Sequence, residues 1–135
     1  MSSSIVIVSI ARTPIAKFCG SFQSLKASEL GSIAIKGALS RLGGASVDIN
    51  EGFIGNVVGA GMGQAPARQA ILGAGLPEST IATTVNKVCA SGTKSIMLGA
   101  QTLLCAGTST PGYAVLAGGM ESMSNIPHYL PKSRR

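Results

Sequence analysis

Four apolar segments of strand length alternate with three stretches of helical spacing along this chain. Residues 5–10 are apolar apart from Ser9 and rich in β-branched side chains. An unbroken run of this kind, bounded by the sequence RTP at residues 12–14, is typical of a strand buried in a parallel sheet. Further strands are predicted at residues 52–58, 81–88 and 113–117.

The stretches between these strands predict three helices. We expect the first to have Ser28 as its N-cap and Glu29 in its first turn, and to end at glycines 43–44. The second is predicted to begin at Pro66, because proline suits the first turn of a helix. The third follows Cys89 and is apolar on most sides, which predicts burial in the middle of a protein. Its remaining face carries the small residues Gly92, Ser95 and Gly99.

The alternation of strands and helices predicts the fold class. It indicates an α/β protein with a parallel-rich βαβαβαβ sheet, right-handed crossovers and helices on both faces. Ligand sites in such sheets lie at the carboxyl ends of the strands. Three segments fall at such ends, namely the glycine loop 59–63, Cys89 and residues 118–122.

Composition narrows the class of protein. A chain of 135 residues holds one domain at most, and 45% hydrophobic against 12% charged residues indicates a globular chain. The net charge of +6 owes three of its eleven basic residues to positions 132–135. The other basic residues are scattered and not interleaved with aromatic ones, which argues against nucleic-acid binding. No apolar run reaches the roughly 18 residues that a membrane span needs.

The three cysteines bear on metal binding and compartment. Cys19, Cys89 and Cys105 have no C-x-x-C spacing, so neither a zinc site nor a disulfide framework is expected. Free cysteines fit a reducing compartment. The first residues carry neither a basic, apolar leader nor an Arg-rich presequence. We therefore expect a cytoplasmic protein, with mitochondria and peroxisomes left open.

Cys89 is the candidate catalytic residue. At a strand-to-helix junction, free backbone N–H groups and the positive end of the helix dipole converge. That field favours the thiolate, which is the nucleophile, and Lys87 and Lys94 would add to it. The alternative is that Cys89 only packs, since free cysteines are among the most buried residues.

A cysteine nucleophile usually needs a base within hydrogen-bond reach. His128 is the one histidine of the chain, and Glu121 lies near the end of the fourth predicted strand. His128 serves equally as a solvated side chain, and Glu121 equally as a cap for a backbone N–H. The loop 59–63 suggests a phosphate cradle, but Gln64 stands where the dinucleotide pattern requires glycine.

Four segments resemble a known family. Residues 86–92 (NKVCASG) resemble the acylation-site motif of thiolases, and residues 118–124 (GGMESMS) resemble the second thiolase signature. Residues 12–14 (RTP) and 63–69 (GQAPARQ) also match, in the same order and spacing. The chain is therefore similar to thiolases over nearly its whole length, and closer to acetoacetyl-CoA thiolases than to the long-chain degradative ones.

The resemblance implies a domain organisation and a reaction. Residues 1–119 would form part of a thiolase N-terminal domain, and residues 120–135 would begin the loop domain. Cys89 would take the acetyl group of acetyl-CoA, with its backbone N–H in an oxyanion hole, and a second acetyl-CoA would then attack to give acetoacetyl-CoA. The reverse reaction is thiolysis. The resemblance implies a coenzyme A thioester as substrate, no metal and no tightly bound cofactor. It also implies a homodimer or homotetramer, with the strand 81–88 paired across the dimer interface.

Thiolases are much longer than this chain. By resemblance, the catalytic histidine, the second catalytic cysteine, the asparagine of the other oxyanion hole, the main coenzyme A contacts and the last strand of the sheet lie outside it. Neither His128 nor Cys105 matches those motifs, and the connection 107–112 is longer than is usual in the family. An alternative function is therefore an inactive chain that acts as an interaction module with intact thiolase subunits.

Overall fold

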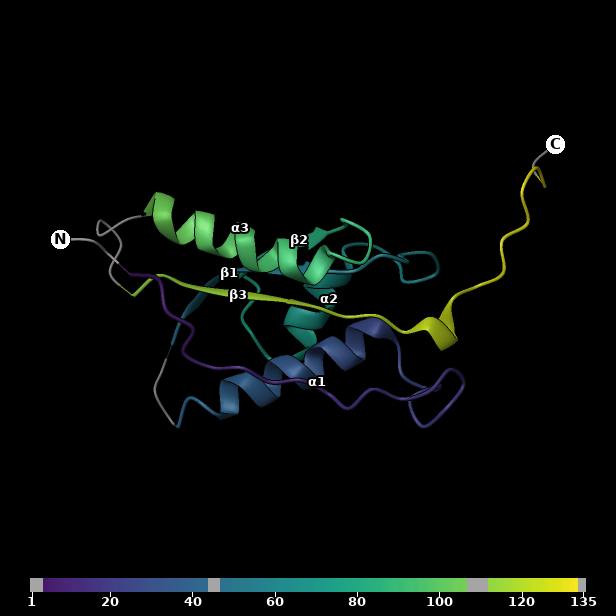
Figure 1. Ribbon diagram of the computed structural model, residues 1–135, viewed down its shortest axis with the longest axis horizontal. Coiled ribbons are helices and arrows are strands. Elements are labelled where there is room, and N and C mark those ends of the chain that lie inside the picture. The colour runs from purple at the N-terminus through teal and green to yellow at the C-terminus, as the bar shows by residue number, and fades with distance from the viewer. Residues whose placement is uncertain (1–3, 44–46, 107–111, 134–135) are drawn as a thin grey trace.

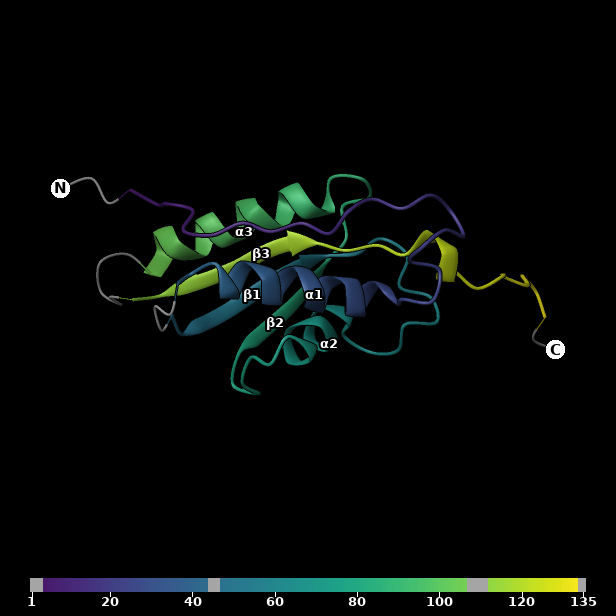
Figure 2. The ribbon, with the colours of Figure 1, turned by 90° about the horizontal axis from the view of Figure 1, so that it is seen from below.

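A computed structural model describes residues 4–43, 47–106 and 112–133 of the chain. A three-stranded sheet lies between helix α3 on one face and helices α1 and α2 on the other (Figures 1 and 2). The protein is therefore α/β, as predicted. The strands are β1 (Ile49–Gly55), β2 (Ile81–Val85) and β3 (Ala114–Gly119). The helices are α1 (Ala27–Ser40), α2 (Pro66–Gly73), α3 (Ser91–Ala106) and the short 3₁₀ helix η2 (Met123–Asn125).

The central strand β1 runs parallel to both of its neighbours, in the order β2-β1-β3. Gly55, the last residue of β1, pairs with Val85 of β2 and Gly119 of β3, which are also the last residues of their strands. The three strands therefore end level. The loops that follow them start from one edge of the sheet, as the α/β pattern requires.

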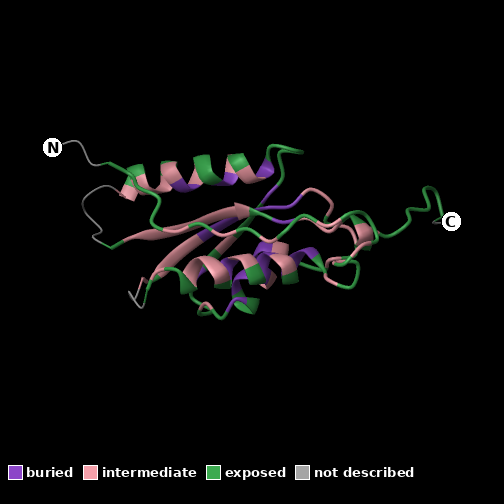
Figure 3. Cartoon of the chain, turned by 60° about the horizontal axis from the view of Figure 1, so that its bottom comes forward, coloured by how far each residue is buried: buried purple, intermediate pink, exposed green. Residues whose placement is uncertain are grey.

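The core lies between the sheet and the helices α1 and α2. Figure 3 shows buried residues on the sheet and on the inner faces of these two helices. Ile71 of α2 is fully buried and packs with Ile54 of β1 and Ile35 of α1. Small residues bring the helices together, because a Cβ on Gly31 of α1 would lie 3.1 Å from the Cβ of Ala70.

Substitution of Ile71 by alanine should destabilise the protein by roughly 2–5 kcal/mol, because it empties a fully buried site. Leu72 is the matched control, since it is the next residue of α2 and its side chain is 37% exposed. Leu72→Ala should cost clearly less. Urea unfolding of the two variants measures the difference, and equal midpoints would contradict this account of the core.

The predicted strand at residues 5–10 is wrong. This segment is extended but belongs to no sheet, and Ile7 and Ile10 are about three-quarters exposed. Its polar groups bond to α1: Ser9 Oγ donates to the carbonyl oxygen of Ala38 at 2.6 Å, and the Arg41 guanidinium donates to that of Ile10. A strand needs a ladder partner. The segment has none among the described residues, so its β-branched composition alone does not make it one.

An open slot separates the extended segment from β3. It has a volume of about 320 Å³ and is mostly apolar. Residues 5–11 form one wall and residues 115–119 of β3 form the other. Residues of helices α1 and α3 and Ile54 of β1 also line it. The slot therefore lies along the outer edge of β3, where a further strand of the sheet would run.

Two expectations about the helices also differ from the structure. Helix α1 begins at Ala27 with Lys26 as its N-cap, not at Ser28, because the Glu29 carboxylate accepts the Lys26 backbone N–H at 2.7 Å. Helix α3 is buried on one face only, at Ser91, Ser95 and Gly99. Its outer face is exposed, and no described residue covers it.

Two further expectations concern the connection 107–112 and membrane spans. Of that connection only Gly112 is among the described residues. Within residues 4–43, 47–106 and 112–133, every helix is too short or too polar to cross a membrane.

Candidate active site

The loops that follow the three strands meet at one edge of the sheet and bond to one another there. The Asn56 backbone N–H donates to the carbonyl oxygen of Val85 at 3.0 Å, and the Met120 N–H donates to that of Gly55 at 2.9 Å. These contacts join the loop after β1 to the ends of β2 and β3. The predicted convergence of the glycine loop, Cys89 and residues 118–122 at this edge is confirmed.

Cys89 lies in a tight turn of residues 86–91, here called the Cys89 turn, which connects β2 to α3. Ser91 closes the turn: its Oγ accepts the Lys87 N–H at 2.9 Å and donates to the Val88 carbonyl oxygen at 2.6 Å. Helix α3 begins two residues after Cys89. Cys89 is exposed, so the reading of this cysteine as a buried packing residue is wrong.

The residue before Cys89 has a strained backbone. Val88 has φ of +49°, in the left-handed region that β-branched residues rarely adopt. That conformation costs about 1–2 kcal/mol and persists only where the surroundings fix it. Asn86 supplies one such contact, because its Oδ1 accepts the Val88 N–H at 3.0 Å. The Cys89 turn is thus held in a shape that its own sequence disfavours.

Glycines let the first turn of α3 lie directly on the ends of the strands. A Cβ on Gly55 would lie 2.6 Å from the carbonyl carbon of Ser91 and 2.7 Å from the Gly92 nitrogen. A Cβ on Gly119 would lie 3.3 Å from the Cα of Gly92. Because no side chain intervenes, the N-terminus of α3 and the preceding Cys89 turn sit against the carboxyl edge of the sheet.

Glu121 caps backbone groups of the loop after β1. Its Oε2 accepts the Val57 N–H at 2.9 Å, and its Oε1 accepts the Asn56 Nδ2 at 2.9 Å and the Val58 N–H at 3.4 Å. Both carboxylate oxygens are therefore occupied as acceptors. Of the two roles considered for Glu121, the structure supports the cap and not the acid or base.

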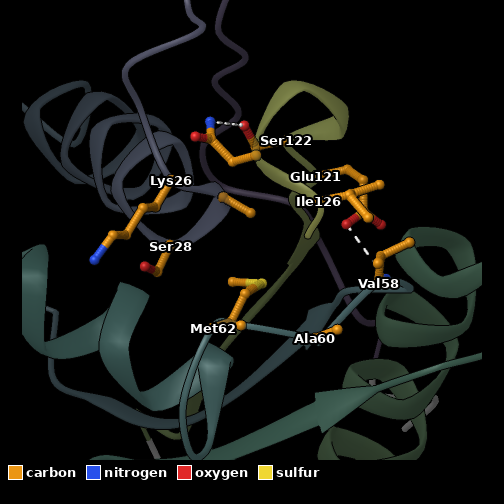
Figure 4. Close-up of a pocket in the computed structure, with 11 residues that line it drawn as sticks. Lys26, Ser28, Val58, Ala60, Met62, Glu121, Ser122 and Ile126 are labelled. Atoms are coloured by element: carbon orange, nitrogen blue, oxygen red, sulfur yellow. Dashed lines mark hydrogen bonds between the residues drawn. The ribbon is translucent and has the colours of Figure 1, made fainter. Parts of the chain in front are cut away.

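A small pocket of about 110 Å³ lies beside Glu121, between the start of α1, the glycine loop and η2 (Figure 4). Glu121 faces Val58 across the pocket wall, whereas the Lys26 amino group points away from Glu121. Asn125 donates to Ser122 Oγ at 2.9 Å and to the carbonyl oxygen of Leu25 at 2.9 Å. The polar groups of this pocket thus hold the segments together.

The other candidate residues do not join Cys89. His128 is exposed in the extended segment beyond η2, which runs away from the body of the molecule (Figure 1). The hydrogen bonds among the described residues include none from His128, so the structure does not support a dyad with Cys89. Cys19 and Cys105 are free and exposed. Within the described part of the chain, no three His, Cys, Asp or Glu side chains gather as a metal site.

The glycine loop is closed by its own contacts. Gln69 Nε2 donates to the carbonyl oxygens of Met62 at 2.7 Å and Gln64 at 2.8 Å, and the Met62 N–H donates to that of Gly59. A phosphate cradle presents backbone N–H groups to its ligand. The contacts here instead tie the loop to α2, which argues against nucleotide binding.

Two asparagines of this edge were not singled out from the sequence as site residues. Asn56 is buried directly after β1, and Asn86 directly follows β2. Their place after predicted strands was the available signal. Each has a partner in another loop, Glu121 for Asn56 and Val57 for Asn86, at separations of 65 and 29 residues that local sequence does not reveal.

Comparison with known proteins gives the family. The family model described as "Thiolase, N-terminal domain" matches residues 5–135. The chain belongs to the thiolase family. It is 60% identical over 130 residues to the cytosolic acetyl-CoA acetyltransferase of Gibberella zeae, covering 96% of this chain and 32% of that protein. It is 56% identical over 134 residues to an acetyl-CoA acetyltransferase of Schizosaccharomyces pombe, covering 99% and 33%.

A solved thiolase shares the fold. The crystal structure of a thiolase from Ascaris suum, in complex with coenzyme A, matches with a TM-score of 0.82 and 42% sequence identity. The match covers 93% of this chain and 32% of the Ascaris chain. The chain thus spans about a third of the length of the relatives that it matches.

Proposed function

We propose that this chain is the acyl-accepting part of a thiolase, in which Cys89 carries the acetyl group between two molecules of acetyl-CoA. The observation that carries the proposal is the place of Cys89, exposed at the carboxyl edge of the sheet in a strained turn before α3. Family membership and relatives named acetyl-CoA acetyltransferases support the substrate.

The first step is transfer of the acetyl group to the enzyme. Cys89 Sγ attacks the carbonyl carbon of acetyl-CoA, an Sγ–C bond forms, the bond to the coenzyme A sulfur breaks, and the thiol proton passes to that sulfur. Backbone N–H groups at a helix N-terminus stabilise negative charge on a carbonyl oxygen. The Cys89 N–H is the donor proposed for this oxyanion, because the turn leads directly into α3.

The second step forms a carbon–carbon bond. A second acetyl-CoA loses a methyl proton to a base, its carbon attacks the acetyl group, and the Cys89 thiolate leaves as acetoacetyl-CoA forms. Neither Glu121 nor His128 is placed to act as that base at Cys89. The described residues therefore support the acetylation step, and the proton abstraction needs a group supplied from elsewhere in a complete thiolase.

The proposal extends to organisation. We infer that residues 1–119 form part of an N-terminal domain and that residues 120–135 begin a loop domain. β2 is an edge strand whose outer edge is unpaired in the described residues, which supports homo-oligomer formation through this strand. The exposed free thiols at Cys19, Cys89 and Cys105 support a reducing compartment such as the cytosol. The compartments of relatives differ, because the Danio rerio protein, 56% identical, is mitochondrial.

Incubation of this chain with acetyl-CoA, followed by peptide mass spectrometry, tests the proposal. We expect an acetyl group on Cys89 and none on Cys19 or Cys105. All three thiols are exposed, so the latter two report non-specific acetylation within the same molecule. Equal labelling of the three cysteines, or none, would contradict activation of Cys89 in this chain. Absence of label would favour the inactive interaction module instead.

A further inference from the structure

We propose that Asn86 and Glu121 are positioning residues for Cys89. Both side chains hydrogen-bond to one peptide group of the loop after β1, and together they fix the Cys89 turn. The proposal rests on the proposed function of Cys89, but it concerns contacts that lie outside the reacting atoms. It deepens that function by naming what sets the direction of the thiol.

The shared hydrogen-bond partner is the peptide group between Val57 and Val58. Its N–H donates to Glu121 Oε1 at 3.4 Å, and its carbonyl oxygen accepts Asn86 Nδ2 at 3.0 Å. The preceding peptide N–H, that of Val57, donates to Glu121 Oε2 at 2.9 Å. The 2.9 Å bond from the Val57 N–H has the length of a charge-assisted bond, which is about twice as strong as a neutral one, whereas the 3.4 Å bond from the Val58 N–H is long and contributes less. Glu121 therefore holds this peptide from one side and Asn86 from the other.

Asn86 links this peptide to the Cys89 turn. Its Nδ2 donates to the Val57 carbonyl oxygen, while its Oδ1 accepts the Val88 N–H at 3.0 Å. A side-chain amide offers a donor and an acceptor on one rigid plane. The orientation of the Asn86 amide is thus set by the position of Val57, which Glu121 fixes in turn.

The hydrogen bonds of Asn86 hold Val88 at its strained positive φ. A β-branched residue at +49° reverts to a negative φ when its restraints are lost, which would redirect Cys89, the next residue. The Asn86 bond to the Val88 N–H opposes that change. Cys89 is already exposed, so loosening the turn cannot speed its reaction by giving a reagent better access. Because loosening also redirects the thiol, the expected effect is a slower reaction.

The test measures alkylation of Cys89 by iodoacetamide relative to Cys105 in the same molecule, by peptide mass spectrometry. Asn86→Ala and Glu121→Gln should each lower the Cys89-to-Cys105 rate ratio about fivefold, the equivalent of one hydrogen bond of about 1 kcal/mol. Asn125→Ala is the matched control. Asn125 is also an exposed asparagine that bonds to backbone carbonyls, those of Gln23 and Leu25, but it does not contact the Cys89 turn. It should leave the ratio unchanged.

A second-site variant separates positioning from general destabilisation. Glycine adopts a positive φ freely, so Asn86→Ala combined with Val88→Gly should recover most of the ratio that Asn86→Ala loses. A double variant as slow as Asn86→Ala would overturn the explanation from the Val88 backbone. If Asn86→Ala does not fold, Glu121→Gln provides the test, because it keeps the size of the side chain.

The outcomes also separate this proposal from the proposed function. Wild-type ratios in both Asn86→Ala and Glu121→Gln would overturn the positioning role, whatever acetyl-CoA does. A fall in both ratios, in a chain whose Cys89 takes no acetyl group from acetyl-CoA, would support the positioning role and refute the function. If the Cys89-to-Cys105 rate ratio also falls in Asn125→Ala, the falls reflect unfolding, and that result would count against the proposal.

Discussion

Cys89→Ser is expected to remove the acetyl adduct and to lower the rate of transfer from acetyl-CoA by at least about 1000-fold, as loss of a catalytic nucleophile does in other enzymes. A serine hydroxyl is a weak nucleophile unless an adjacent base activates it. Neither Glu121 nor His128 is placed to do so. The substitution exchanges one exposed atom and should therefore leave the fold intact.

Cys105→Ser is the control for this prediction. Cys105 is also exposed, and it lies near the other end of α3, away from the edge of the sheet where the loops meet. Its variant should keep the adduct at the wild-type rate. An adduct that survives in Cys89→Ser and disappears in Cys105→Ser would show that the wrong thiol has been assigned.

Gly55→Ala is expected to destabilise the protein strongly, with a loss of about 3 kcal/mol or more. The added Cβ would lie 2.6 Å from the Ser91 carbonyl carbon and 2.7 Å from the Gly92 nitrogen. Both atoms are backbone and belong to the first turn of α3, so the helix has to move as a whole. Displacement of that turn should also slow alkylation of Cys89, which the ratio to Cys105 measures.

Two neighbouring glycines test whether backbone contact is the cause. Apart from its chain neighbours and the nearby backbone of its own helix, a Cβ on Gly92 would come no closer than 3.8 Å to another atom, and alanine favours a helix by up to about 1 kcal/mol over glycine. Gly92→Ala should therefore be neutral or stabilising. A Cβ on Gly52 would meet Ile71 Cδ1 at 2.5 Å, but the end of a side chain can turn away, so Gly52→Ala should cost less than Gly55→Ala. Thermal midpoints that fail to follow this order would refute the explanation.

The sequence predicted those elements whose signals are local. Pro66 marked the start of α2. The β-branched residues around Ile81 and Val85 marked β2. The segment 5–10 has a stronger β-branched pattern than β2 but forms no strand, because pairing depends on a partner elsewhere in space. Amino-acid composition indicates which segments are able to form paired strands, but it does not determine which of them pair in the folded protein.

The candidate site divides in the same way. The strand-to-helix junction placed Cys89 at the carboxyl edge of the sheet, and the structure has it there. The catalytic role of Cys89 stays a prediction. The positive φ of Val88 and the contact of Glu121 with Asn56 had no signal in the sequence. The Val88 backbone is held by side-chain bonds within the Cys89 turn, and the Glu121–Asn56 bond joins two loops whose residues are 65 positions apart.

The open slot beside β3 has a consequence for how this chain behaves at high concentration. Among residues 4–43, 47–106 and 112–133, the outer edge of β2 is also unpaired, on the opposite side of the sheet, so this part of the chain offers two edges to which another strand can add. Residues 5–10, uncharged, free of proline and largely exposed, supply a strand of the kind that adds to such edges. A molecule with two free sheet edges and one exposed segment that can pair with them is not restricted to forming dimers. The size of such open-ended assemblies then depends on protein concentration. A segment that fills the slot would block the β3 edge and stop the addition of further molecules there.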